Sequence, residues 1–245
     1  MDEMPNPASS GPAEVGPDTG GRWPSKPVGG HVALDFLNTT AAPRGTPIEW
    51  IGNGGDLLGW LVGAGILDSS EAERIAATAP LMVLDAVSEG AVELREWFRG
   101  VLTRAKAVGP NAIGNEDIEH LNGVLARGAA FQRVGFAGAE GRLRVVTDQR
   151  LREPGELLVP VAAAMADLLC ESAFDLVRRC GNPACTAWFY DRTKGHRRRW
   201  CSQAVCGNRA KVAAHRRRQR LSHPREAGDA SSTTSQLNAG EGGDR

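Results

Sequence analysis

Apolar residues recur at helical spacing along much of the chain, which predicts a mostly helical fold. Residues 56–67 predict one helix, and Asp68 is a candidate N-cap for a second. Pro80 predicts the first turn of a third helix that continues to about residue 107 and ends before Gly109–Pro110. The expected buried side of this helix consists of Leu84, Val87, Leu94, Phe98, Val101 and Leu102.

Two further helices are predicted toward the C-terminus. Asn115 is a candidate cap for a helix over about residues 116–127, with Ile118, Leu121 and Leu125 on its apolar face. After a break at Pro154–Gly155, a long apolar pattern predicts a helix over about residues 156–177. This helix would lead the chain directly to Cys180 without a flexible linker.

Strand patterns are short. Val32, Leu34 and Phe36 alternate with smaller or polar residues, which predicts a strand within residues 29–40 that ends near Asn38. Residues 131–136 and 142–147 flank the turn-rich sequence AGAEG and predict a β-hairpin. The expected fold class is therefore α+β: a mostly helical N-terminal domain with a short β-hairpin.

Cysteine spacing after this domain predicts a small treble-clef-like zinc finger. Cys180 and Cys185 form one C-x4-C pair, and Cys201 and Cys206 form another after fifteen residues. Paired cysteines at this spacing are typical of structural zinc sites. Disulfides and iron–sulfur ligation are the alternatives, and a reducing compartment disfavours the first. Cys170 is predicted to be a small buried apolar residue of the preceding helix.

Secondary structure around the cysteines is also predicted. Residues 188–190 (Trp-Phe-Tyr) predict a strand, Lys194–Gly195 a turn, and residues 197–200 a return strand. Ser202 is a candidate N-cap for a helix that carries Cys206 and reaches Arg220. A module of this size buries too little surface to fold alone, so the zinc ion is expected to be structural, and four thiolates leave no position for a catalytic water.

Charge is unevenly distributed. Residues 178–220 contain thirteen Lys and Arg and one acid, Asp191, whereas the remainder contains sixteen basic and twenty-eight acidic residues. The net charges are therefore +12 and −12, which predicts a basic nucleic-acid-binding part joined to an acidic globular part. The expected contact residues are Arg197, Arg198, Arg199, Asn208, Arg209, Lys211, Arg216, Arg217, Arg218 and Arg220.

Other side chains of the finger receive structural interpretations. His196 and His215 are expected to be polar surface or phosphate-facing residues, because the four thiolates already complete a metal shell. Trp188, Phe189, Tyr190 and Trp200 are expected to form a miniature core, with one of them able to stack on a base.

Residues 1–27 are rich in Pro and Gly, and residues 221–245 are polar, so both are predicted to be disordered tails. The chain has no run of eighteen apolar residues and no basic-then-apolar leader at its start. These features predict a cytoplasmic protein.

Two motifs resemble known families. The sequence CGNR at residues 206–209, after WCS at 200–202, resembles the CGNR zinc-finger family, and CGN at 180–182 with FYD at 189–191 is similar to that family's first half. The sequence LDFLNT at residues 34–39 resembles the opening signature of the ABATE domain, which usually precedes this finger. The resemblance implies an ABATE-like domain at 28–177, a finger at 178–220, one zinc ion on the four paired cysteines, and a proposed role in stress-induced transcription.

We therefore expect a zinc-dependent DNA-binding transcriptional regulator that is not an enzyme, with an N-terminal domain that senses a small molecule or a protein. RNA binding in translational control and a protein-interaction module with structural zinc are the alternatives. Asn208 and Arg209 either read base edges or brace the finger. Asp35 and Asn38 either cap the end of a strand or form part of a pocket.

Overall fold

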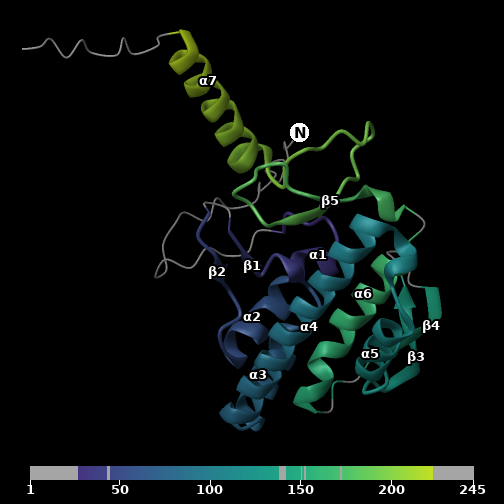
Figure 1. The fold of residues 1–245 in the computed structure, drawn as a ribbon. Coiled ribbons are helices and arrows are strands. Elements are labelled where there is room, and N and C mark those ends of the chain that lie inside the picture. Colours follow the sequence, from purple (N-terminus) through teal and green to yellow (C-terminus); the bar gives the residue numbers. More distant parts are fainter. Residues whose placement is uncertain are drawn as a thin grey trace, which may run out of the picture. The chain divides into compact units, whose positions relative to one another are not determined.

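The computed structural model describes residues 27–42, 45–137, 142–149, 151, 153–171 and 173–222. It forms two compact units, one ending at Gly207 and the other beginning at Asn208. Helices α1–α6 and the sheets belong to the first unit, and helix α7 (Asn208–Ser222) belongs to the second (Figure 1). The predicted disordered tails lie outside the described residues, apart from residues 27, 221 and 222, and the predicted domain limits stay predictions.

Helix α1 (Val32–Leu37) occupies the segment that was predicted to be a strand, so that prediction is wrong. His31 caps the helix by accepting a hydrogen bond from the Ala33 N–H at Nδ1 (3.2 Å). The strand prediction used the alternation of Val32, Leu34 and Phe36 and did not consider Ala33 and Leu37. Burial of these two residues completes one face of a helix. The buried residues of α1 are Ala33, Leu34, Phe36 and Leu37.

The next three helices confirm the sequence prediction. Helix α2 (Gly54–Gly63) ends a turn earlier than expected, α3 (Ser69–Thr78) begins after Asp68, and α4 (Leu81–Val108) begins after Pro80. The predicted buried side of α4 is buried except at Val87, which is partly buried. Between α1 and α2 lies an antiparallel pair of short strands, β1 (Thr40–Ala41) and β2 (Ile48–Glu49).

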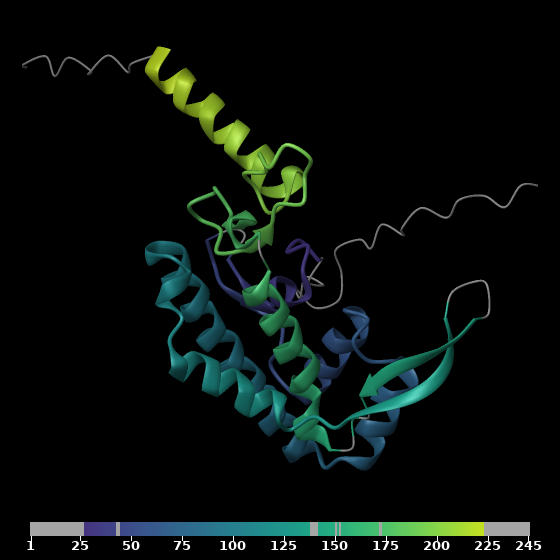
Figure 2. The ribbon, with the colours of Figure 1, turned by 90° about the vertical axis from the view of Figure 1, so that its right-hand side faces the viewer.

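Helix α5 (Asn115–Leu125) is capped by Gly114 rather than by Asn115, which occupies its first position. Leu121 is buried as predicted, but Ile118 is 49% exposed, so its place on the buried face was predicted wrongly. The predicted hairpin is confirmed as β3 (Ala130–Ala137) and β4 (Arg142–Gln149), antiparallel strands that form a two-stranded arm beside the helices (Figure 2).

The long helix predicted over residues 156–177 is confirmed only as far as Cys170, and its continuation to residue 177 is wrong. A 3-10 turn (Pro154–Leu158) precedes α6 (Val159–Cys170), and the helix ends where Glu171 takes an extended conformation. A second 3-10 turn (Phe174–Leu176) then leads into strand β5 (Val177–Arg179). The apolar spacing suited a continuing helix, but pairing of Val177 with Tyr190 in a sheet overrides that local preference.

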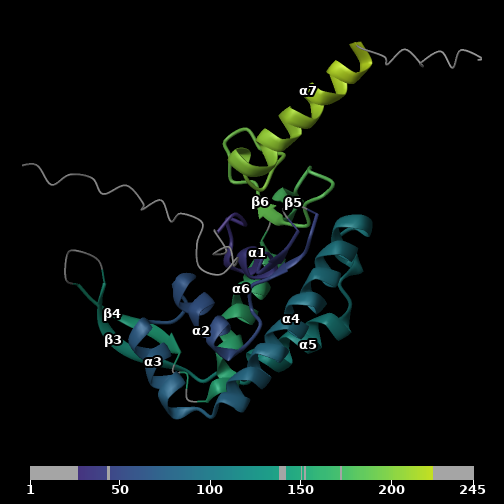
Figure 3. The same cartoon turned by 90° about the vertical axis from the view of Figure 1, so that its left-hand side faces the viewer.

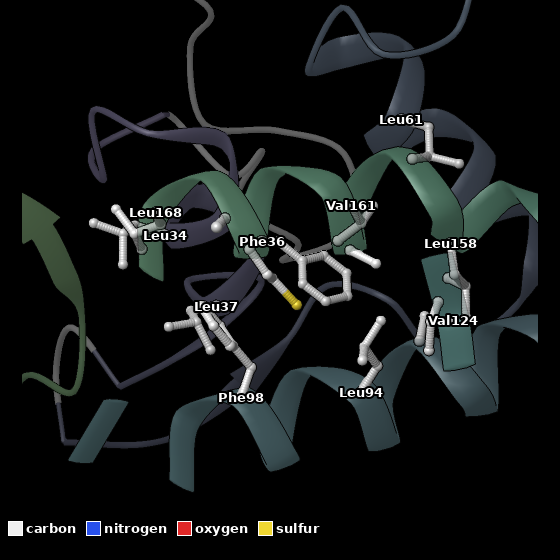
Figure 4. Close-up of a cluster of buried hydrophobic side chains, with 14 of the residues drawn as sticks. Leu34, Phe36, Leu37, Leu61, Leu94, Phe98, Val124, Leu158, Val161 and Leu168 are labelled. Atoms are coloured by element: carbon white, nitrogen blue, oxygen red, sulfur yellow. The ribbon is translucent and has the colours of Figure 1, made fainter. Parts of the chain in front are cut away.

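A single core joins these helices. Figure 4 shows Phe36 of α1 between α4 and α6, next to Leu94 and Phe98. Phe36 also packs against Trp60 of α2, with ring centroids 5.1 Å apart. The same cluster of buried residues includes Trp188 and Tyr190, which follow the first cysteine pair in sequence. The core therefore extends into the cysteine-rich region. None of the helices that the structure describes is long and apolar enough to cross a membrane.

Candidate zinc centre and basic surface

The first cysteine pair lies at the closed end of a hairpin formed by β5 and β6 (Trp188–Tyr190), beside α1 (Figure 3). Val177 pairs with Tyr190, and Arg179 pairs with Trp188. Pairing of β6 with a return strand at residues 197–200 was predicted wrongly, because those residues form no strand. The true partner strand precedes the first cysteine, so the loop between the two strands carries both thiols.

Backbone hydrogen bonds shape this loop. The Cys180 N–H donates to Ala187 O (2.9 Å), and the Cys185 N–H donates to Asn182 O (2.8 Å). The Gly181 N–H donates to Arg199 O (2.8 Å), and a Cβ at Gly181 would lie 3.0 Å from that oxygen. The absence of a side chain at Gly181 thus lets the segment before Cys201 approach the first cysteine pair.

The second cysteine pair flanks a helical turn. Ser202 Oγ accepts a hydrogen bond from the Val205 N–H (3.3 Å), as expected of an N-cap. Ser202 O accepts hydrogen bonds from the N–H groups of Cys206 (2.9 Å) and Gly207 (3.1 Å). The turn Gln203–Gly207 is a π-helix, wider than the α-helix that was predicted there. This geometry brings the Cys206 and Cys201 sulfurs to 3.6 Å.

All four sulfurs meet at one buried point. The Sγ atoms of Cys180, Cys185, Cys201 and Cys206 lie within 4.8 Å of one another. The Cys185–Cys201 separation is 3.8 Å. Four thiolates arranged tetrahedrally about 2.3 Å from a zinc ion would lie about 3.8 Å apart. All five cysteines of the chain are free of disulfides, so the cluster fits a single zinc ion.

The pKa values of the clustered cysteines also favour binding of a metal cation among the four sulfurs. Hydrogen bonds with Cys185 and Cys201 lower the pKa of Cys180 to about 2, whereas the hydrogen bond with Cys180 raises the pKa of Cys185 to about 12. Hydrogen bonds with Cys180 and Cys185 raise the pKa of Cys201 as well. One thiolate therefore suppresses ionisation of its neighbours, and a bound metal ion is what allows all four to ionise.

Two polar groups around the cluster orient the sulfurs. The Cys201 N–H donates to Cys180 Sγ (3.5 Å), and Asn182 Nδ2 lies 3.7 Å from Cys206 Sγ as a donor. Asn182 Oδ1 in turn accepts from the Ala184 N–H (3.2 Å), which fixes the amide. Such outer contacts hold metal ligands in place.

Asn38 joins the N-terminal helices to the cysteine hairpin. Its Nδ2 donates to Trp188 O, and its Oδ1 accepts from the Trp188 N–H, both at 2.8 Å. Nearby, the Ala42 N–H donates to Thr186 Oγ1 (3.0 Å), and the Tyr190 N–H donates to Gly29 O (2.6 Å). Asn38 is only 6% exposed, so it satisfies backbone groups that would otherwise be buried without a partner.

Asp35 has a more local structural contact. Its Oδ1 accepts a hydrogen bond from the Gly29 N–H (2.7 Å). Burial raises the pKa of Asp35 despite backbone hydrogen bonds from Gly29 and Val28 that act in the opposite direction. This carboxyl group holds the segment before α1 against the start of that helix.

Asp191 organises the loop that carries the first arginine cluster, which consists of Arg197, Arg198 and Arg199. It accepts hydrogen bonds from Thr193 Oγ1 (2.6 Å) and the Arg198 N–H (2.9 Å), and Arg178 Nη1 lies 3.4 Å away. Burial alone would raise the pKa of Asp191, but these hydrogen bonds and charges outweigh burial and lower it. Sequence reasoning missed this role, although Asp191 is the one acid in the basic stretch.

The three consecutive arginines differ in their surroundings. Arg198 donates to Val28 O (2.7 Å), Trp200 O (3.0 Å) and Cys201 O (2.6 Å). Its guanidinium carbon also lies 4.4 Å from the centre of the Phe189 ring. The two neighbouring arginines, Arg197 and Arg199, are exposed. Arg198 is therefore engaged inside the fold, while its neighbours face solvent.

The second arginine cluster lies on α7, in the second compact unit. Every side chain over residues 211–219 is exposed, and the helix contains no acidic residue. Asn208 is exposed and Arg209 is partly buried at the start of the helix. The predicted contact residues found on α7 are Asn208, Arg209, Lys211, Arg216, Arg217, Arg218 and Arg220.

Other expectations have mixed outcomes. Cys170 is exposed, so the prediction that it is a small core residue is wrong. The expected miniature aromatic core is split: Trp188 and Tyr190 belong to the main core, whereas Phe189 and Trp200 pack with the cysteines. The two histidines, His196 and His215, are exposed as expected.

Comparison with protein-family models gives two matches. Residues 30–172 match the model ABATE, described as "Putative stress-induced transcription regulator", and residues 177–219 match the CGNR zinc-finger model. The first match includes Asn38, and the second includes all four clustered cysteines. A search of curated proteins gave no match.

Proposed function

We propose that this chain, which belongs to the ABATE family and carries a CGNR zinc finger, is a DNA-binding transcriptional regulator. The proposed ligands of its zinc ion are Cys180, Cys185, Cys201 and Cys206. The role assigned to the ion is structural, because four buried protein thiols fill a tetrahedral shell and leave no open position for substrate. Both matched families are regulatory or zinc-finger types rather than enzyme families.

The observation that carries the proposal is the chemistry of α7. This helix carries six Lys and Arg side chains and no acid, and its exposed middle section has no buried apolar face. A helix with so little buried apolar surface gains little stability from packing, so a binding partner is the natural source of its stabilisation. DNA phosphates would neutralise these cations and release counterions, which favours binding.

Different residues of the basic region are assigned different tasks. Arg216, Arg217 and Arg218 are proposed to contact phosphates, as are the exposed Arg197 and Arg199 of the loop. Asn208 and Arg209 lie at the start of α7, where recognition helices commonly contact base edges. We assign Arg198 to the structure of the finger rather than to DNA, because its donors already meet three backbone carbonyls.

The test is a salt titration of binding to a short random-sequence DNA duplex, measured by fluorescence anisotropy. The variant Arg216→Ala/Arg217→Ala/Arg218→Ala should weaken binding and reduce the salt slope by up to about 0.9 for each lost phosphate contact. The matched control replaces the same three residues by Lys. It keeps the charge and should keep the slope.

An unchanged slope in the alanine variant would refute phosphate contact by α7. Tighter binding to single-stranded RNA of the same length would replace the DNA proposal by the RNA alternative. Binding to neither nucleic acid would favour a protein-interaction module in which zinc is only structural.

A further inference from the structure

A hollow of about 460 Å³ lies where the N-terminal helices meet the cysteine hairpin, within the first unit. Its wall is formed by Thr40 and its neighbours in strand β1, by Arg95 and Arg99 of α4, and by Arg179, Thr186 and Trp188 of the hairpin. This volume lies within the range of small-molecule sites in proteins. The site therefore has both the size of a ligand pocket and a lining drawn from both matched regions.

The deep part of the hollow is electrostatically balanced. The Arg95 side chain is 2% exposed and donates to Glu49 through Nη1 (2.7 Å) and Nη2 (2.5 Å), and to Thr39 Oγ1 (2.9 Å). Glu96 accepts from Arg99 Nε (2.9 Å) and Arg95 Nε (3.0 Å). Burial opposes ionisation of Glu96, but hydrogen bonds from Arg99 and Arg95 outweigh it and lower its pKa. The carboxylates of Glu49 and Glu96 are thus both paired with arginines.

Arg179 supplies the excess charge. With Arg95, Arg99 and Arg179 against Glu49 and Glu96, the lining carries one more positive than negative group. Among the residues that the structure describes, Arg179 has no carboxylate within ion-pair distance, and its guanidinium lies 5.7 Å from the Trp188 ring centre. It is exposed, so it can reach a ligand without breaking an existing ion pair.

The rest of the lining suits an organic molecule. Thr186 Oγ1 already accepts from the Ala42 N–H, so its hydroxyl proton can be donated to a ligand. Thr40 adds a second hydroxyl, and Ala41, Ala42 and Pro47 form an apolar side. A cation, hydroxyl donors and an apolar wall together select a small molecule with one anionic group and one apolar part.

We propose that this hollow binds a small organic anion, whose carboxylate or phosphate is held by Arg179 and whose apolar part lies against the wall of strand β1. Such a ligand would contact both the ABATE region and the hairpin that carries Cys180 and Cys185. It would therefore strengthen the attachment of the zinc finger, which Asn38 already holds through Trp188. This proposal does not depend on DNA binding, because its test measures ligand binding alone.

The experiment uses the zinc-loaded full chain, isothermal titration calorimetry and thermal unfolding. Benzoate and phenyl phosphate are the anionic probes, and benzamide is the neutral control. We expect one or both anions, but not benzamide, to bind and to raise the unfolding temperature with increasing concentration. The better anion identifies the head group as carboxylate or phosphate.

Variants test the assigned residue. Arg179→Ala should weaken binding about tenfold, because a charge-assisted hydrogen bond is lost. Arg127→Ala, an exposed arginine outside the hollow, is the matched control and should leave the affinity unchanged. Because Arg179 precedes Cys180, the zinc content of each variant is measured as well. If Arg179→Ala loses zinc, Thr40→Val decides, with an expected loss of affinity of a few-fold.

Three results would overturn the proposal. The first is that neither anion binds to the wild-type chain. The second is that benzamide binds as tightly as the anions. The third is that Arg127→Ala loses as much affinity for the anions as Arg179→Ala, or as Thr40→Val where that variant decides. This result would show that the anions bind elsewhere.

Discussion

Both ends of the zinc-finger region carry basic residues in the sequence, but they lie in different surroundings. The hairpin β5–β6 contributes Val177, Trp188, Phe189 and Tyr190, all at most 7% exposed. In α7, every side chain over residues 211–219 is exposed. The hairpin is thus part of the protein's core, whereas the helix presents its side chains to solvent. The two ends therefore differ in how much apolar surface they bury, rather than in the sign of their charge.

The cysteines connect these two environments. The first pair lies on the hairpin loop, and the second pair lies at the turn that precedes α7. We therefore expect the core to position the first pair even before a metal binds. The second pair depends on local turn geometry and on the sulfur cluster itself. Each part of the finger should respond differently when one of these supports is removed.

The largest effect is expected from removing the metal. Cys206→Ser should abolish tight zinc binding, since structural zinc contributes about 10–16 kcal/mol of apparent binding free energy. Amides of Gln203–Gly207 should then exchange rapidly with solvent, while amides of β6, held by Asn38 and the core, should stay protected. Metal analysis and hydrogen-exchange mass spectrometry measure both outcomes.

Cys170→Ser is the matched control for this variant, because Cys170 is exposed and outside the cluster. It should retain one zinc ion and wild-type exchange. Equal loss of protection in β6 and in the π-turn of Cys206→Ser would show that the hairpin has no support independent of the metal.

The next effect concerns the link between the helices and the hairpin. Asn38→Ala would leave the Trp188 N–H and C=O buried without partners, which should lower the free energy of unfolding by about 2–5 kcal/mol. Urea denaturation checks this value. Asn122→Ala, at an exposed position of α5, should change stability by less than about 0.5 kcal/mol. Similar costs for the two variants would exclude Asn38 as a connecting residue.

A smaller effect separates two adjacent arginines. Arg198→Ala removes hydrogen bonds to three carbonyls and the contact with Phe189, and should cost about 2 kcal/mol of stability. Arg199→Ala should leave stability nearly unchanged and should weaken DNA binding instead. Denaturation and anisotropy measured on both variants test the distinction. If Arg198→Ala and Arg199→Ala show the same ratio of stability loss to loss of DNA affinity, the two arginines do not have different roles.

The sequence predicts the elements whose signal is local. Helix α4 follows from its apolar spacing, and Gly109 ends it with a φ of +113° that other residues rarely adopt. The cysteine cluster also follows from spacing, since two C-x4-C pairs bring four thiols to one point. Ser202 as an N-cap is a third local signal, and the structure bears it out.

Three of the features that the sequence did not reveal share a cause, which is dependence on partners outside the local sequence. Val177 belongs to an apolar run that suits a helix, but Tyr190 provides a strand partner that the run does not reveal. The partners of Asn38 lie 150 residues away, so its amide resembled a local cap in sequence. Arg198 stands between two similar arginines, and only the fold shows that its donors meet backbone carbonyls.

The smallest effect on stability is expected at Cys170, the one cysteine that the fold leaves exposed. Cys170→Ser should change the free energy of unfolding by less than about 0.5 kcal/mol. Its effect on thiol chemistry should be complete, however. A thiol reagent should modify a single cysteine in the zinc-loaded chain, none in Cys170→Ser, and all five after chelation, because metal-bound buried thiolates are protected. Rapid modification of a second thiol while zinc is retained would contradict a cluster in which all four sulfurs bind the metal.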